Sequence, residues 1–165
     1  MGEENTLIYQ QLLIGETLKA AAHSVPNQTA FVYENGQLTY AQLLDRAGKV
    51  SGWLHEQGIQ KDDKIGCIFK NGMAFVELYF GVAVNGAVFV PINFRLTASE
   101  MQYILNNADV KILFIEEEYI EIAREIVPLL PKIEKVIVVD APNEIELDSN
   151  WLLYENIFNA EPYFR

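Results

Sequence analysis

The sequence predicts an α/β protein built around a parallel β-sheet. Short apolar runs of strand type recur along its 165 residues and alternate with segments of helical periodicity, which is the pattern of βαβ units with right-handed crossovers. Half of the residues are apolar and only 21% are charged, so the composition is that of a globular domain and not of a disordered segment.

The N-terminal part predicts a helix followed by a β-hairpin. The spacing of apolar residues predicts a helix from Leu7 to His23. In residues 30–40, two β-favouring runs flank Asn35 and Gly36. This pair suits the two central positions of a type I′ turn, where φ is positive.

Two later helices begin with the signature of a capping box. Thr39 stands three residues before Gln42, and Thr97 stands three residues before Glu100. Each threonine can accept a hydrogen bond from the third helical N–H while the longer side chain bonds back to the cap. The first of these helices is predicted to end at Gly58, where a left-handed conformation carries no steric penalty.

A helix from Met73 to Val84 is predicted to be apolar almost all the way round, with Glu77 as its single charge. Such a helix should be covered on more than one side. A further helix is predicted over 119–130, although Pro128 disturbs its last turn. The predicted strands of the sheet are residues 64–69, 87–93, 110–115 and 135–140.

The last 25 residues or so depart from this alternation. A polar loop leads into an aromatic-rich segment that has no clear helix cap, and this segment, like the apolar helix, predicts a need for further protein to cover it. We expect one α/β subdomain over residues 1–165, made of an N-terminal helix and loop (1–28), a hairpin and βαβ core (29–140) and a tail leading to a missing remainder (141–165).

Charge and composition exclude several classes of partner. Twelve Lys and Arg face 23 Asp and Glu, giving a net charge of −11 and a pI near 4.5, so neither nucleic acid nor an anionic membrane is predicted as a partner. The N-terminus lacks the features of a secretory signal, and no apolar stretch reaches the ~20 residues of a transmembrane segment. The single cysteine, Cys67, fits a reducing compartment. We therefore expect a soluble, cytoplasmic protein.

Few residues offer chemistry at the carboxyl ends of the predicted strands, where parallel sheets bind ligands. The common glycine-rich nucleotide loops and the serine nucleophile elbow are missing. We interpret His23 and His55 as surface residues and Cys67 as a buried, inert thiol, and none of them as catalytic. Glu116–Glu118 is interpreted as a helix N-terminus and not as a metal site. Asp140 follows a strand, where dinucleotide folds place a ribose-binding acid, but the missing glycine loop argues against that role. No catalytic residue and no metal ligand is predicted.

Arg95 is the one candidate for ligand binding. It follows strand 87–93 and precedes the helix that Thr97 caps, so its guanidinium could hold a phosphate at the ligand edge of the sheet. The alternative is an ordinary solvated or ion-paired surface arginine, and the spacing alone favours that alternative.

Residues 37–105 and 108–119 resemble the amino-terminal part of the adenylate-forming enzymes, which comprise acyl-CoA synthetases, luciferases and peptide-synthetase adenylation domains. The segments LTYAQL and GAVFVPINFRLT match the first and second core motifs. The tetrapeptide NFRL at residues 93–96 is similar to the N-x-R-L of acyl-CoA and fatty-acid ligases. Phe94 and Asn85 depart from the commoner proline and alanine, which leaves the chain length of the acyl group open.

This resemblance implies the amino-terminal subdomain of the adenylate-forming fold and an acyl-CoA synthetase as the parent protein. Such enzymes join a carboxylic acid, here a fatty acid, to ATP to give an acyl adenylate and pyrophosphate, and CoA then displaces AMP. The parent would use ATP, Mg²⁺ and CoA, and Arg95 would contact the phosphates of the CoA nucleotide.

The resemblance also implies what this chain lacks. The phosphate loop, the ribose-binding aspartate and the catalytic lysine of such enzymes lie further along the chain than Arg165. The implied partner is therefore the remainder of the same polypeptide, a nucleotide-binding core with a mobile carboxyl-terminal domain. The isolated chain is expected to be inactive and to bind no cofactor tightly.

Two alternatives stay open at this point. The chain could be a complete, non-enzymatic α/β module that binds a partner or dimerises, a catalytically dead relative of the synthetases included. The parent could also be an adenylating enzyme with a different acceptor. The acyl substrate and the oligomeric state are not determined by the sequence.

Overall fold

A parallel sheet of five strands forms the centre of the molecule. The computed structural model describes residues 13–34, 36–142 and 145–165. The strands are β3 (Lys64–Ile68), β4 (Val88–Ile92), β5 (Val110–Glu116), β6 (Lys135–Val139) and β7 (Trp151–Leu153). Their spatial order is β4-β3-β5-β6-β7, which confirms the predicted α/β class with a parallel sheet.

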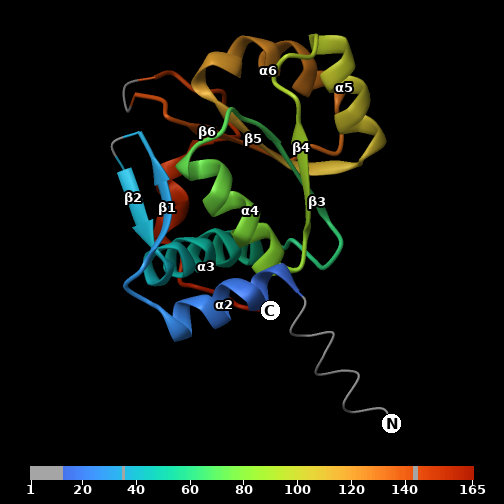
Figure 1. Ribbon diagram of the computed structural model, residues 1–165. Coiled ribbons are helices and arrows are strands. Elements are labelled where there is room, and N and C mark those ends of the chain that lie inside the picture. Colours follow the sequence, from blue (N-terminus) through green and yellow to red (C-terminus); the bar gives the residue numbers. More distant parts are fainter. Residues whose placement is uncertain (1–12, 35, 143–144) are drawn as a thin grey trace.

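Helices cover both faces of this sheet (Figure 1). They are α2 (Ile14–Ser24), α3 (Tyr40–Glu56), α4 (Met73–Asn85), α5 (Ala98–Asn107) and α6 (Ile120–Ile126). Phe114 of β5 packs in the core beneath α3 and α4, and its neighbour Leu113 packs beneath α5 and α6. Successive strand residues point to opposite faces, so the apolar run of β5 serves two cores. Every helix in the described part of the chain is too short or too polar to cross a membrane.

The later part of the predicted N-terminal helix is confirmed among the described residues. Residues 7–12 of the predicted helix lie outside the described residues, and α2 starts at Ile14. Leu13, which lies inside the predicted helix, is the N-cap residue of α2 and is 60% exposed. Leu18 and Ala22, one turn apart, face the core.

The hairpin is confirmed, but its turn lies one residue earlier than predicted. Strands β1 (Thr29–Tyr33) and β2 (Gly36–Thr39) pair antiparallel, with Tyr33 opposite Gly36. Glu34 takes the left-handed conformation with φ 46°, and Gly36 is already the first residue of β2. Because Tyr33 and Gly36 are paired partners, the two residues between them form the turn, which is the commonest length for a hairpin connection. Gly36 is therefore not a central turn residue.

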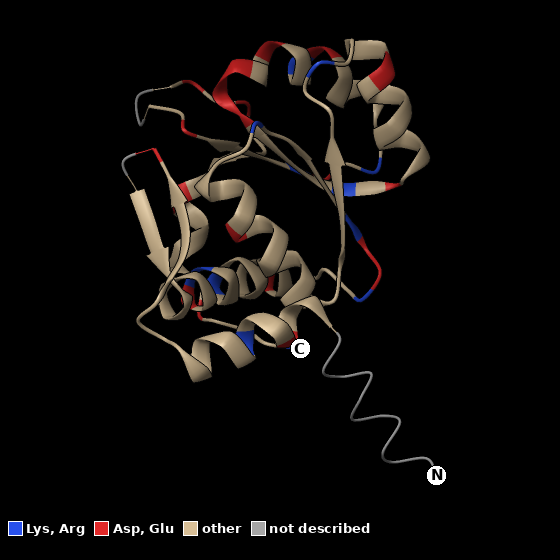
Figure 2. Cartoon of the chain, in the orientation of Figure 1, with Lys and Arg blue, Asp and Glu red and all other residues tan. Residues whose placement is uncertain are grey.

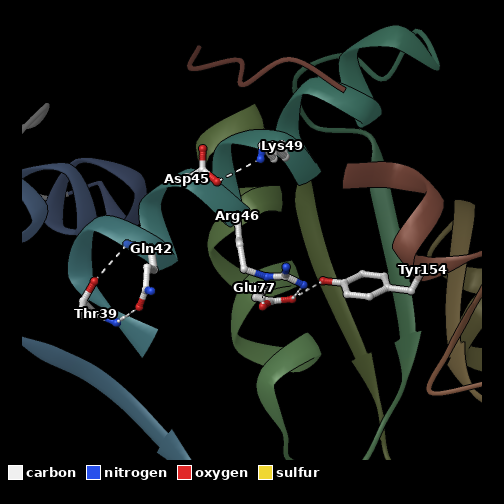
Figure 3. Close-up of polar contacts among 7 residues, drawn as sticks. All are labelled: Thr39, Gln42, Asp45, Arg46, Lys49, Glu77 and Tyr154. Atoms are coloured by element: carbon white, nitrogen blue, oxygen red, sulfur yellow. Dashed lines mark hydrogen bonds and ion pairs between the residues drawn. The ribbon is translucent and has the colours of Figure 1, made fainter. Parts of the chain in front are cut away.

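The local helix signals are confirmed. Thr39 accepts a hydrogen bond from the N–H of Gln42, whose side chain accepts one from the N–H of Thr39 at 2.9 Å (Figure 3). Thr97 and Glu100 form the same box at the start of α5. Gly58 has φ 78°, as expected for a left-handed residue after α3.

The helix predicted over 119–130 is divided into three pieces. A 3-10 turn, η1 (Glu117–Tyr119), leads into α6, and a second 3-10 turn, η2 (Val127–Leu129), follows it. Pro128 lies in η2 and has no N–H to donate, so the α-helical hydrogen-bond pattern stops before it.

The aromatic tail is part of the core, which corrects the expectation that it waits for other protein to cover it. Trp151 begins β7, the fifth strand of the sheet, and the 3-10 helix η3 (Tyr154–Asn159) follows. The strand pairs with β6, so a tail without a helix cap is held by sheet hydrogen bonds. Four of its residues are buried, namely Trp151, Tyr154, Ile157 and Ala160.

The residues after η3 cross α3 at two glycines spaced by one helical turn. A Cβ atom on Gly52 would lie 1.9 Å from the carbonyl oxygen of Glu161, and one on Gly48 would lie 2.6 Å from the ring of Phe164. The N–H of Tyr163 donates to the carbonyl of Gly48 at 3.0 Å. The two glycines therefore let the backbone of the tail lie directly against the helix.

A buried ion pair joins α3, α4 and η3 (Figure 3). The Arg46 guanidinium donates to both carboxylate oxygens of Glu77, which is 3% exposed. The Tyr154 hydroxyl donates to the same carboxylate at 2.9 Å, and the Arg46 guanidinium lies 3.8 Å from the ring centroid of Phe158. The single charge of the apolar helix is thus fully paired inside the protein.

Burial and the charge of Glu77 together shift the pKa values of Tyr154 and Arg46. Removal from water, together with the charge and hydrogen bond of Glu77, raises the pKa of Tyr154 well above its usual value. Burial acts to lower the pKa of Arg46, but the hydrogen bond and charge of Glu77 outweigh it, and the pKa is raised. The Tyr154 phenol and the Arg46 guanidinium therefore stay protonated.

We predict that Gly52→Ala destabilises the chain. The new methyl group meets the Glu161 carbonyl, a backbone atom that cannot rotate away, so the cost of overpacking should be about 2 kcal/mol. Urea denaturation followed by circular dichroism measures it. Ser51→Ala is the matched control, because it removes a buried hydroxyl without a hydrogen-bond partner from the adjacent position; an equal loss in both variants contradicts the prediction.

We predict that Tyr154→Phe costs about 2 kcal/mol at pH 7, since a hydrogen bond to a buried carboxylate is lost. Because the pKa of Tyr154 is raised in the folded state, the unfolded chain alone loses this proton above about pH 10. The stabilisation by the hydroxyl is full below that pH and declines as the pH rises. Urea denaturation at pH 7 and above pH 10 should show the variant's deficit shrinking, while Tyr103→Phe, at a side chain 72% exposed, has no deficit at pH 7. A deficit of constant size contradicts the assignment.

Candidate functional site

The carboxyl ends of β3, β5 and β6 open onto a cleft of about 600 Å³. This is the edge at which open parallel sheets bind ligands. The loops after these strands form one side of the cleft, and the N-terminal turn of α4 and the tip of the β1–β2 hairpin form the rest. Its lining residues include Tyr33, Glu34, Lys70, Asn71, Gly72, Phe75, Glu116, Glu117, Glu118 and Asp140.

Lys70 is the only cation in this lining, and two carboxylates engage it. Its ammonium lies 2.5 Å from Glu118 Oε1, and its backbone N–H donates to Glu116 Oε1 at 3.0 Å. The hydrogen bond from Lys70 lowers the pKa of Glu118. Burial and the neighbouring charge of Glu118 raise the pKa of Glu116. The positive charge of Lys70 is therefore already neutralised.

The electrostatics of the cleft disfavour an anionic ligand. Five carboxylates line it against one lysine, and Figure 2 shows further acidic residues along α6 beside it. A phosphate entering this cleft would meet like charge in a partly desolvated place. Within the described residues there is also no group of three or more side chains able to hold a metal ion. The residues of this cleft do not fit Mg²⁺ or a nucleotide phosphate by themselves.

Arg95 lies outside the cleft, in the turn that follows β4. Its backbone N–H donates to Asn93 Oδ1 at 3.0 Å, and its guanidinium carbon lies 5.3 Å from the ring centroid of Phe94. The side chain is exposed. Among the residues that the structure describes, no carboxylate lies within 4.0 Å of its guanidinium. It is an exposed cation whose bidentate donors are free for an anion.

The other candidate residues occupy structural positions. His23 and His55 are exposed, and the ring of His55 stacks on Tyr163 at 4.0 Å. Cys67 is 1% exposed, and burial raises the pKa of its thiol to about 12, so it is an inert thiol. Asp140 is exposed at the rim of the cleft with φ 58°.

Glu116–Glu118 ends β5 and opens the 3-10 turn before α6, as expected for a helix N-terminus. Sequence reasoning missed the link from this acidic run to Lys70, because the two segments lie 46 residues apart. The sequence did contain a signal for this contact. Lys70 and the acidic run each follow a predicted parallel strand, and the carboxyl ends of parallel strands meet at one edge of the sheet.

The fold and this cleft define an open parallel α/β protein with its ligand edge at the carboxyl ends of the strands. Residues 18–157 match the profile of the family described as AMP-binding enzyme. The chain belongs to this family.

Curated relatives are CoA ligases. A medium/long-chain-fatty-acid–CoA/3-oxocholest-4-en-26-oate–CoA ligase of Mycobacterium tuberculosis is 34% identical over 129 residues, which are 78% of this chain and 24% of the relative. A 4-hydroxybutyrate–CoA ligase of Metallosphaera sedula is 34% identical over 126 residues, 76% of this chain and 23% of the relative. The chain therefore spans about a quarter of the length of these relatives.

Solved structures support the same fold. The coronafacic acid ligase of Pectobacterium brasiliense superposes with a TM-score of 0.85 at 19% identity, covering 93% of this chain and 31% of that one. An anthranilate CoA ligase in complex with anthranoyl-AMP gives a TM-score of 0.83 at 22% identity, covering 90% and 28%. The resemblance to the amino-terminal part of adenylate-forming acyl-CoA ligases is confirmed.

Proposed function

We propose that residues 1–165 are one α/β subdomain of a longer AMP-forming acyl-CoA ligase that acts on a fatty acid. The observation that carries this proposal is the family match over residues 18–157 combined with a span of 24% of a curated fatty-acid ligase. The parent takes a carboxylic acid, ATP with Mg²⁺ and CoA as reactants. The free thiol of Cys67 supports a cytoplasmic location, where such thiols stay reduced.

In this proposal the chain is a scaffold and performs no chemistry alone. Its acidic cleft repels phosphate, and the described residues contain no cluster of metal ligands. The groups that stabilise the charge developing on phosphorus come from the remainder of the polypeptide, a nucleotide-binding core and a mobile carboxyl-terminal domain.

Arg95 is this chain's contribution to ligand binding in the proposal. Its guanidinium is exposed and without a carboxylate partner among the described residues, and a free arginine of this kind fits the phosphates of the CoA nucleotide. Its side chain would hold CoA and would take no part in forming the adenylate.

The parent reading frame and a half-reaction test the proposed function. We expect the frame to continue past the codon of Arg165, and the long polypeptide to catalyse ATP–pyrophosphate exchange that depends on a fatty acid. The 165-residue chain should show no exchange under the same conditions. A frame that stops at Arg165, or robust exchange by the short chain, contradicts the proposal and favours a self-contained module.

Arg95→Ala in the long polypeptide should raise KM for CoA by about tenfold, the effect of losing a charge-assisted hydrogen bond of about 1.5 kcal/mol. The ATP–pyrophosphate exchange, which does not require CoA, should stay unchanged. Arg124→Ala is the control, because Arg124 is exposed on α6 and paired with Glu121 and Asp148. An unchanged KM for CoA in the Arg95 variant overturns this role.

A further inference from the structure

Helix α4 is oriented with its polar residues toward the protein interior. Glu77 and Asn85 are buried on the side that faces α3, where Asn85 Nδ2 donates to the carbonyl of Ser51 at 3.2 Å. The opposite side of the helix is apolar and only half-buried. Amphipathic surface helices show the reverse arrangement. The residues of this outward side are Phe75, Val76, Tyr79, Phe80 and Ala83.

Phe89 of the neighbouring edge strand β4 extends the same surface. Its ring centroid lies 5.4 Å from that of Phe75 and 5.7 Å from that of Tyr79, in edge-to-face contacts. Tyr79 in turn contacts Phe80 at 5.2 Å. These rings form one continuous aromatic surface, which we name the α4 face: Phe75, Val76, Tyr79, Phe80, Ala83 and Phe89.

The described residues cover the α4 face only in part. Val76 and Phe80 pack beside Leu18 of α2, and Phe75 and Phe89 pack against the core beneath α3 and α4. These four side chains of the α4 face nevertheless stay only half-buried. The α4 face carries no charged side chain. A connected aromatic surface of this kind in a folded protein marks a place where other protein packs.

The position of Arg165 relative to α4 indicates which polypeptide packs on the α4 face. The N–H of Arg165 donates to the carbonyl of Val84 at 3.3 Å, so the chain ends at the C-terminal turn of α4 (Figure 1). A polypeptide continuing from Arg165 would start at the C-terminal turn of the helix that carries the α4 face. The curated relatives have about three quarters of their length outside the matched part.

We propose that the α4 face is the surface on which the polypeptide beyond Arg165 packs in the longer ligase. This inference rests on the proposed function. It assigns the occupant as an apolar, uncharged surface of the same chain, because the α4 face offers aromatic rings and no charge to pair with.

Thiol labelling tests this contact with little perturbation of the fold. The native thiol of Cys67 is buried and its pKa is raised to about 12, so it gives a low background. Tyr79→Cys places a reactive thiol on the α4 face. Tyr103→Cys is the matched control, a tyrosine 72% exposed on α5 at the other face of the sheet. Both variants are made in the 165-residue chain and in the long polypeptide, and are treated with a maleimide.

We expect both thiols to be labelled in the short chain, and the Tyr79→Cys thiol alone to lose labelling in the long polypeptide. Equal labelling of Tyr79→Cys in both forms, in a long polypeptide that catalyses ATP–pyrophosphate exchange, overturns the inference and leaves the proposed function intact. Protection already in the short chain that grows with protein concentration also overturns it, because a second copy then covers the face. A reading frame that ends at the codon of Arg165 contradicts both the proposed function and this inference.

Discussion

The buried pairing of Glu77 with Arg46 and Tyr154 is the interaction on which the arrangement of this chain depends. A carboxylate 3% exposed is tolerated only when its charge and its lone pairs are satisfied. Its two partners come from helix α3 and from the 3-10 helix η3, which lies 77 residues away in the chain. Three elements must therefore be in place together before the charge can be buried.

Two further features follow from this constraint. Tyr154 can reach Glu77 only if the preceding residues form β7 and the following residues cross α3, and the glycines at 48 and 52 make that crossing sterically possible. The orientation of α4 is set as well. Since Glu77 must face Arg46, the opposite side of the helix, with Phe75 and Tyr79, must face outward. The inward charge and the outward aromatic surface are two consequences of one helix rotation.

Features determined by neighbouring residues could be predicted from the sequence, and those determined by distant contacts could not. The capping boxes at Thr39 and Thr97 and the left-handed Gly58 depend on residues within one helical turn. The parallel strands could also be predicted, because each is a short apolar run in the sequence. The burial of the tail and the contact between Lys70 and Glu118 depend on segments brought together by the sheet. The turn of the hairpin was displaced by one residue, because strand register and not residue preference sets its position.

The separation of charges explains why the candidate site is divided. The cleft at the strand ends is acidic and the lysine that lines it is neutralised, while Arg95, which has no ion pair among the described residues, lies beyond β4. An enzyme that handles triphosphate must neutralise several negative charges at one place. This chain does not do so within its described residues, which is consistent with a scaffold that presents one arginine and an uncharged packing surface. In the ligase that we propose, the phosphate chemistry then falls to the polypeptide beyond Arg165, and this chain contributes the α4 face as a packing surface and Arg95 as a cation.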